Sequence, residues 1–314
     1  MTSTIPDETP ANPRVHRAVL IAGAAIAVAI VALAIASGTG PLSAPKAIVM
    51  GLVEGITEFL PVSSTGHLLI TQRLLHLGSG AGKTAADTYA IAIQFGAILA
   101  VVALYRGRIV HLVQGAVGKD AEGRTLLVRL IVAFIPAAVI GGALDHKIKA
   151  HLFAPWPVVG AWAVGGVFLL VWKPKHGTKT LTELTVRSAV IIGFAQALAL
   201  WPGVSRSLVT IVAALAVGLD IGAAVEFSFL LGLATLSAAT ALDLAKDGHT
   251  LIHDYGILTP LLGALVAFVA AVAAVRWLVS YLNTRPLRNF GYYRIAVAAV
   301  TVVLIATNTI SAKL

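Results

Sequence analysis

Long runs without charge recur along this chain, and they restrict its fold more than any other feature. Residues 18–37 are all uncharged, and a helix of that length crosses the roughly 30 Å hydrocarbon core of a bilayer. Charged residues make up only 12% of the sequence, against about a quarter in a soluble domain. We therefore expect an all-α polytopic membrane protein. A cleaved signal peptide is the alternative for 18–37, although its apolar core is shorter, about 7–15 residues.

Further apolar runs predict the other membrane helices. Full spans are expected at 88–105, 125–145, 155–173, 225–245, 256–280 and 291–311, which with the first run gives about seven transmembrane helices. We expect a polar tail at 1–16, an additional N-terminal transmembrane helix at 17–38, and a single integral membrane domain over 45–314. The chain has no cysteine, which excludes disulfides and thiolate metal sites.

Two apolar stretches, 45–75 and 186–219, are each broken near the middle by proline and serine. They align without a gap at a constant offset of 142, so that Val62-Ser63-Ser64-Thr65 meets Val204-Ser205-Arg206-Ser207. Three predicted spans separate them, and an odd number of spans inverts the second copy. We predict an inverted-topology repeat, with repeat 1 over 45–173 and repeat 2 over 186–311. Each copy contributes one re-entrant helical hairpin, and the two hairpin tips meet near the bilayer midplane.

Basic residues predict the orientation. The side that holds the N-terminus and the loops 106–124, 173–187 and 281–290 carries twelve of them, against seven on the other side. By the positive-inside rule the first side is cytoplasmic, and the first hairpin opens outward. Arg294 is assigned to a span end on the cytoplasmic side. Since the net charge of +9 lies in short loops, without a basic face interleaved with aromatics, it does not predict nucleic-acid binding.

The first tip combines carboxylates, hydroxyls and an imidazole. Glu54 and Glu58 are four residues apart in a half-helix predicted over 51–61, so they share one face. Pro61 should end that half-helix, and Ser63 or Ser64 can cap the next one. A helix N-terminus is a ready anion site, and His67 lies one turn further along.

The second tip adds a positive charge. Pro202-Gly203 breaks the helix, Ser205 can cap the next helix, and Arg206 falls in its first turn. Two helix N-termini and an arginine suit phosphate, while the two carboxylates suit a divalent cation, Mg²⁺ or Ca²⁺. The alternative is structural. Hydroxyls in membrane helices often bond back to the backbone, and the ionisable residues could form an ion-pair cluster.

The segments EGITEFLPVSSTGH (54–67) and PGVSRS (202–207) closely resemble the two signature motifs of the bacterial undecaprenyl-diphosphate phosphatase family, the bacitracin-resistance type. The resemblance implies removal of the terminal phosphate of undecaprenyl diphosphate, which recycles the lipid carrier of cell-wall synthesis. It also implies a divalent cation and a multi-pass protein of the bacterial cell membrane whose site faces the outer side. Leu208 departs from the family pattern, which usually has glycine there, and the family core lacks a span like 18–37.

From the tips and the resemblance together we expect the following site. The catalytic residues are Glu58, Ser64, His67 and Arg206; the substrate contacts are Ser63, Thr65, Ser205 and Ser207; the metal ligands are Glu54 and Glu58. Ser64 is preferred over Ser63 as the hydroxyl nearest the chemistry, and activated water stays open as the attacking group. The expected partners are the lipid substrate and the bilayer, and a homo-oligomer is compatible with the sequence.

Two other functions fit parts of the pattern. A lipid or anion transporter would use the same inverted-repeat architecture, but transport should survive the loss of His67, whereas hydrolysis should not. A structural scaffold would leave four ionisable groups at membrane depth without a purpose.

Overall fold

A computed structural model describes residues 42–77, 82–173 and 177–312 of the chain. This part is helical, and its β pairing is limited to one isolated bridge between Lys179 and Leu219. The predicted tail at 1–16 and the additional helix at 17–38 lie outside the described residues. The all-α expectation is confirmed for the described residues.

The helices follow one another through short connections. Their bounds are α2 Ala44–Thr57, α3 Ser64–Leu74, α4 Lys83–Ala92, α5 Gln94–Leu104, α6 Arg106–Ala116, α7 Ala121–Leu152, α8 Pro155–Val171, α9 Val186–Ala197, α10 Arg206–Ala216, α11 Ile221–Tyr255, α12 Leu258–Leu282 and α13 Arg288–Ala306. Two short 3₁₀ turns, η2 Leu181–Glu183 and η3 Leu198–Leu200, precede and follow α9.

Five segments of the described chain are long and apolar enough to cross a membrane. They are α4 with α5 (Lys83–Leu104), α7, α11, α12 and α13. The expected span at 155–173 is present as α8, but it has 17 residues and is shorter than these five. The expected loop 106–124 is partly wrong, because its first half folds as α6. The chain is thus a polytopic helical membrane protein.

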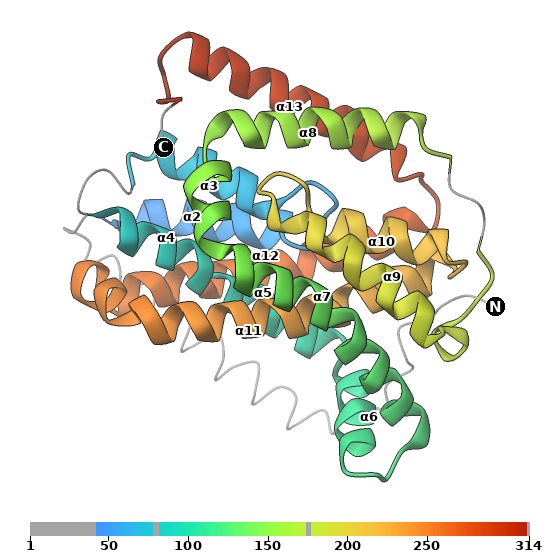
Figure 1. Cartoon of the computed structure of the whole chain (residues 1–314). Coiled ribbons are helices and arrows are strands. Elements are labelled where there is room, and N and C mark those ends of the chain that lie inside the picture. Colours follow the sequence, from blue (N-terminus) through green and yellow to red (C-terminus); the bar gives the residue numbers. More distant parts are fainter. Residues whose placement is uncertain (1–41, 78–81, 174–176, 313–314) are drawn as a thin grey trace.

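The two broken stretches become two helix–turn–helix units that approach each other from opposite sides. In Figure 1, α2 and α3 lie to the left and α9 and α10 to the right, and their turns meet in the middle of the molecule. α2 packs on α12 through Gly51 and Gly55, where a Cβ would clash with the carbonyls of Gly263 and Ala267. These two glycines therefore allow the close packing of the two helices.

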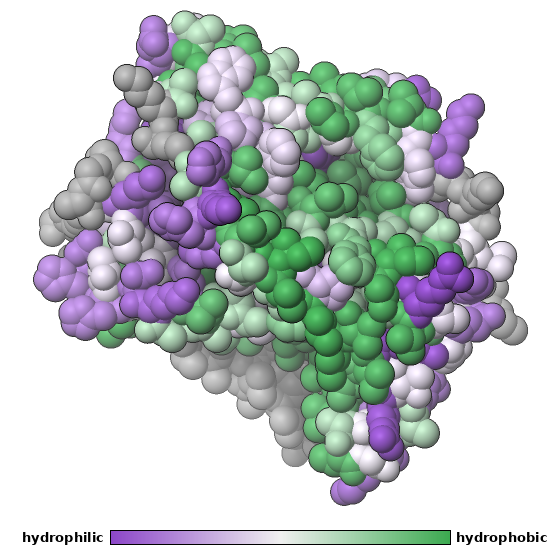
Figure 2. Space-filling view, in the orientation of Figure 1, coloured by the Kyte–Doolittle hydropathy of each residue, from purple (hydrophilic) through white to green (hydrophobic). Residues whose placement is uncertain are grey.

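Hydrophobic side chains cover the outside of the helices. Figure 2 shows them across the middle of one face, with hydrophilic residues gathered toward its left and right ends. Val139 and Val164, on α7 and α8, are 64% and 72% exposed. In water such a surface would be an aggregation liability, whereas a bilayer provides an apolar solvent for it.

Candidate active site at the two helix turns

Both turns have the same backbone geometry. Ser63 and Ser205, which are 142 residues apart, each have φ 75° and each precede the first residue of a helix. The Ser63 hydroxyl accepts from the Gly66 amide at 3.4 Å, and the Ser205 hydroxyl accepts from the Leu208 amide at 3.3 Å. Positive φ is uncommon for a residue with a side chain, so its recurrence marks the turns as equivalent. The predicted Ser205 cap is confirmed, and Ser63 rather than Ser64 caps α3.

The first half-helix ends earlier than predicted. α2 stops at Thr57, not at 61, and Glu58 is its C-cap, with its amide still donating to the Glu54 carbonyl at 2.9 Å. Pro61 has no amide to donate to the carbonyl of Thr57, and it disfavours helical backbone at Leu60. The proline therefore terminates the helix several residues ahead of itself, and the carboxylate of Glu58 lies at the helix end.

Hydrogen bonds lock the two turns together. The Ser63 hydroxyl also accepts from the Gly203 amide at 3.1 Å, while the Ser207 hydroxyl donates to the Leu60 carbonyl at 2.7 Å. The Ser205 hydroxyl donates to the same carbonyl at 3.4 Å. Three of the four predicted substrate contacts therefore have hydroxyls bonded within and between the turns. The fourth, Thr65, is partly exposed on α3.

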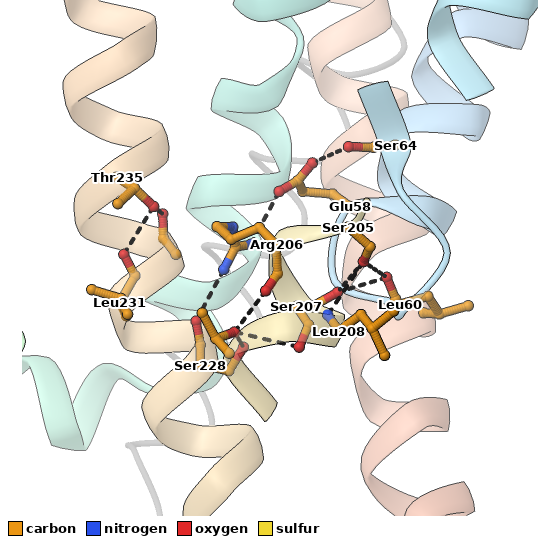
Figure 3. Close-up of polar contacts among 12 residues, drawn as sticks. Glu58, Leu60, Ser64, Ser205, Arg206, Ser207, Leu208, Ser228, Leu231 and Thr235 are labelled. Carbon is orange, nitrogen blue, oxygen red and sulfur yellow. Dashed lines mark hydrogen bonds and ion pairs between the residues drawn. The ribbon is translucent and has the colours of Figure 1, made fainter. Parts of the chain in front are cut away.

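Glu58 joins the two turns electrostatically. One of its carboxylate oxygens accepts from the Ser64 hydroxyl, and the other accepts from Nη2 of Arg206 at 3.0 Å (Figure 3). Glu58 is 6% exposed, so this ion pair is shielded from water. Hydrogen bonds to its remaining atoms stabilise a buried charge pair, and Ser64 supplies one to Glu58, whereas Nε of Arg206 has no partner among the described residues. Three of the four predicted catalytic residues thus lie in one network.

Arg206 rests on the surface of α11. Its Nη1 donates to the Ser228 carbonyl at 3.0 Å, and its guanidinium lies 5.6 Å from the centre of the Phe59 ring. Gly232, one turn after Ser228, makes the room, because a Cβ there would overlap the guanidinium. Neither Ser228 nor Gly232 was expected at the site. Gly232 carries no chemical signal in a sequence, since its contribution is the absence of a side chain.

Glu54 has the most unusual surroundings. It is fully buried, and neither of its carboxylate oxygens has a hydrogen-bond partner among the described residues. Its charged neighbours are Glu58 and Arg206. We call Glu54 and Glu58 the carboxylate pair. Two buried carboxylates side by side, one without a donor, are a donor set that fits a hard divalent cation, and Mg²⁺ commonly uses one or two carboxylates plus phosphate and water. The described residues contain no group of three or more acidic, histidine or cysteine side chains placed to hold a metal ion, so the pair provides only part of a coordination shell.

His67 belongs to a second network on the other side of the turns. Its Nδ1 lies 2.6 Å from the Ser63 carbonyl, and its Nε2 lies 2.8 Å from the hydroxyl of Tyr293 on α13. The edge of its ring meets Trp162 of α8, whose indole nitrogen donates to the Val62 carbonyl at 2.9 Å. No carboxylate among the described residues pairs with this histidine. His67 and the Glu58 network are therefore connected through the backbone of the first turn.

Arg294, which was assigned to a span end on the cytoplasmic side, is instead buried among the helices. It is fully buried, and its guanidinium donates to the carbonyls of Gly203 at 2.8 Å and Ala161 at 2.9 Å. Longer bonds reach Val204 at 3.3 Å and Pro61 at 3.4 Å. One side chain of α13 thus ties both turns to α8. An arginine inside an apolar helix is functional by default, but Arg294 lies close enough to the start of α13 that the sequence pattern fits an interfacial arginine equally well.

Comparison with known proteins identifies relatives over most of the chain. The family model of BacA, the bacitracin resistance protein, matches residues 47–300. The undecaprenyl-diphosphatase of Sorangium cellulosum is 44% identical over 261 residues, which is 81% of this chain and 83% of that protein. The undecaprenyl-diphosphatase of Deinococcus deserti is 42% identical over 272 residues, covering 84% of this chain and 96% of its own length. Undecaprenyl-diphosphatase 1 of Chromobacterium violaceum is 46% identical over 254 residues, or 79% and 92% of the two chains. These relatives carry the name of an enzyme and give the transporter alternative no support. The chain belongs to the BacA family of bacitracin resistance proteins.

Proposed function

We propose that this protein is an undecaprenyl-diphosphate phosphatase of the membrane. It hydrolyses undecaprenyl diphosphate to undecaprenyl phosphate and inorganic phosphate, which recycles the lipid carrier for cell-wall synthesis and confers bacitracin resistance. The observation that carries the proposal is the contact of Glu58 with both Ser64 and Arg206, where two helix N-termini meet. The relatives named above are diphosphatases, and the site offers the parts that such a reaction needs.

Electrostatics should provide most of the catalysis. Phosphoryl transfer depends mainly on positioning and on stabilising the charge of the transferring group. Arg206 and the N-termini of α3 and α10 present donors for phosphate oxygens, and an entering phosphoryl oxygen competes with Glu58 for Nη2 of Arg206. Thr65, Ser63, Ser205 and Ser207 are proposed as substrate contacts from these same two turns.

Two attacking groups fit the site. Ser64 already directs its proton at Glu58, so Ser64 attack would pass that proton to Glu58, form a phosphoserine and expel the bridging oxygen with undecaprenyl phosphate. Water would then cleave the phosphoserine and release inorganic phosphate. In direct hydrolysis, water attacks the terminal phosphorus, gives up its proton to Glu58, and the same bridging oxygen leaves. His67 is proposed as the acid or base that exchanges protons with the reacting groups.

The carboxylate pair, Glu54 and Glu58, would hold Mg²⁺ or Ca²⁺. When bound, the cation supplies positive charge that neutralises the diphosphate and orients it. Support comes from the buried Glu54 carboxylate, which has no donor among the described residues.

The proposed membrane arrangement follows the same two turns. We propose about seven membrane helices in an inverted-topology repeat, in which α2–α3 and α9–α10 are re-entrant hairpins. The protein would lie in the bacterial inner or plasma membrane with a cytoplasmic N-terminus and a site open to the outer side, either as a monomer or as a homo-oligomer. A reporter fused at Lys119 should read cytoplasmic, and an external signal would overturn this orientation.

One assay tests the activity. Purified protein receives undecaprenyl diphosphate with Mg²⁺ or Ca²⁺, released phosphate is measured, and the assay is repeated with a chelator. Glu58→Gln should abolish release, while Glu122→Gln, at an exposed acid of the first turn of α7, should leave it unchanged. Wild-type protein that releases no phosphate with any divalent cation would sink the proposal.

A further inference from the structure

The hydrogen bonds of His67 specify its tautomer. A carbonyl oxygen only accepts, so the 2.6 Å contact between Nδ1 and the Ser63 carbonyl places a proton on Nδ1. In the neutral ring Nε2 then carries the lone pair, and the Tyr293 hydroxyl, 2.8 Å away, donates to it. In most triads a carboxylate fixes the histidine, whereas here a backbone carbonyl and a phenol do so.

Aromatic contacts fix the plane of the ring. Tyr293 stacks on His67 with its ring tilted by only 14° and the centroids 5.8 Å apart. Trp162 approaches from α8 with the centroids 4.8 Å apart and the planes at 61°. Gly66 allows this approach, because a Cβ there would press into the indole of Trp162. The imidazole is thus restrained in position, in plane and in tautomer before any substrate binds.

The position of Tyr293 is itself fixed by its neighbour. Arg294 holds α13 to both turns through three carbonyls and to α8 through a fourth, and the next residue back along the helix is Tyr293. The register of α13 therefore places the phenol opposite His67. Arg294 of α13 is the charged group that acts on His67 of α3, and α8 contributes the uncharged Trp162.

The two aromatic rings on either side of His67 differ sharply in solvent exposure. Trp162 behind the imidazole is 1% exposed, whereas Tyr293 in front of it is 43% exposed. His67 lies between these extremes with intermediate exposure, and the phenol hydroxyl bonded to its Nε2 lies on the more exposed side. Tyr292, the preceding residue, is also exposed but lies under the guanidinium of Arg288 and has no contact with His67.

We propose that Tyr293 is the positioning residue of His67: its hydroxyl keeps Nε2 as the hydrogen-bond acceptor and connects it to the exterior for proton exchange. The inference rests on the proposed phosphatase activity. It assigns α13, a helix that carries neither signature motif, a direct part in the site. Tyr293 acts through His67, so its effect should vanish when His67 is removed.

Phosphate release from undecaprenyl diphosphate tests this with wild-type protein, Tyr293→Phe, Tyr292→Phe, His67→Gln and the double variant of 67 and 293. Tyr293→Phe keeps the stacked ring and should lower kcat about tenfold, with KM within about twofold, because one hydrogen bond to a reacting group is lost. Tyr292→Phe should match the wild type. The double variant should be no slower than His67→Gln alone.

Three outcomes are separated. Wild-type protein without activity would overturn the proposed function itself. Tyr293→Phe at wild-type activity, or losses that multiply in the double variant, would overturn the positioning role. If the Tyr293→Phe variant unfolds, difluorotyrosine at position 293 replaces it in the test. This residue keeps the ring and hydroxyl of tyrosine, but its hydroxyl loses its proton at lower pH than that of tyrosine. The alkaline limb of the pH–rate profile should then move to lower pH, and an unmoved limb would contradict the proposal.

Discussion

Gly232→Ala is the sharpest test of the Arg206 site, because it moves the guanidinium without changing any reacting group. A Cβ at 232 would lie 2.6 Å from Nη2 of Arg206, and nearer still to Nη1 and Cζ, which is closer than real Cβ contacts occur. The obstructing atoms are the far end of a flexible side chain, so Arg206 moves and α11 does not. Its 3.0 Å bonds to Glu58 and to the Ser228 carbonyl cannot both survive that shift.

The expected effect can be worked from this geometry. The guanidinium must move by roughly 1 Å, and a misplacement of that size costs about 100-fold in rate. Loss of a charge-assisted bond, about 1.5–3 kcal/mol, gives a similar figure. Stability should fall as well, by the energy of the lost bond less the roughly 0.5–1 kcal/mol that alanine in a helix interior gains over glycine. Released phosphate and the thermal midpoint in detergent are measured for Gly232→Ala and for Gly248→Ala, the control on α11 with only ordinary contacts of 3.8 Å. Activity of Gly232→Ala within about twofold of the wild type would refute the placement of Arg206.

Three further predictions concern stability and metal. Gly165→Ala should destabilise the protein by about 2 kcal/mol, because its Cβ would displace the Arg294 guanidinium from short bonds to carbonyls. Gly160→Ala is the control on the same helix, since a Cβ there meets nothing within 4 Å and should not destabilise the protein. Equal thermal midpoints for the two variants would contradict the stabilising role of the Arg294 bonds. Ser207→Ala removes the 2.7 Å bond to the Leu60 carbonyl and should cost about 1 kcal/mol of stability. It should also raise KM, because Ser207 is proposed as a substrate contact, and an unchanged KM would contradict that contact. Chelation should abolish phosphate release and added Mg²⁺ or Ca²⁺ should restore it; full activity with chelator would contradict a metal at the carboxylate pair.

The parts of the fold that local chemistry decides could be read from the sequence. Pro61 predicted a helix end, and Ser63 or Ser64 predicted the start of the next helix. Pro202-Gly203 and Ser205 predicted the same pair of features in the second copy. The constant offset of 142 then indicated that the two turns are equivalent, which their shared backbone angle bears out. The exact end of α2 was missed, because a proline removes the hydrogen bond to the carbonyl four residues earlier in the chain.

Contacts between distant segments could not be read in the same way. Arg294 lies within two turns of the start of α13, where a sequence pattern cannot distinguish an interfacial arginine from a buried one. Only packing reveals that its guanidinium meets backbone carbonyls of both turns. His67 was expected beside Glu58, yet the orientation of its ring depends on Trp162 and Tyr293, which come from two other helices.

The aligned turns have diverged in charge, and that divergence explains how they hold together. Glu54 and Glu58 of the first copy align with Gln196 and Leu200 of the second, while Arg206 of the second aligns with Ser64 of the first. If both copies carried the carboxylates, four negative charges would meet in a buried space, and like charges there repel strongly. With all the acid in one turn and the arginine in the other, the Glu58–Arg206 pair attracts the turns to each other. Glu54, whose carboxylate has no hydrogen-bond partner among the described residues, holds the excess of acid over base that a divalent cation would balance.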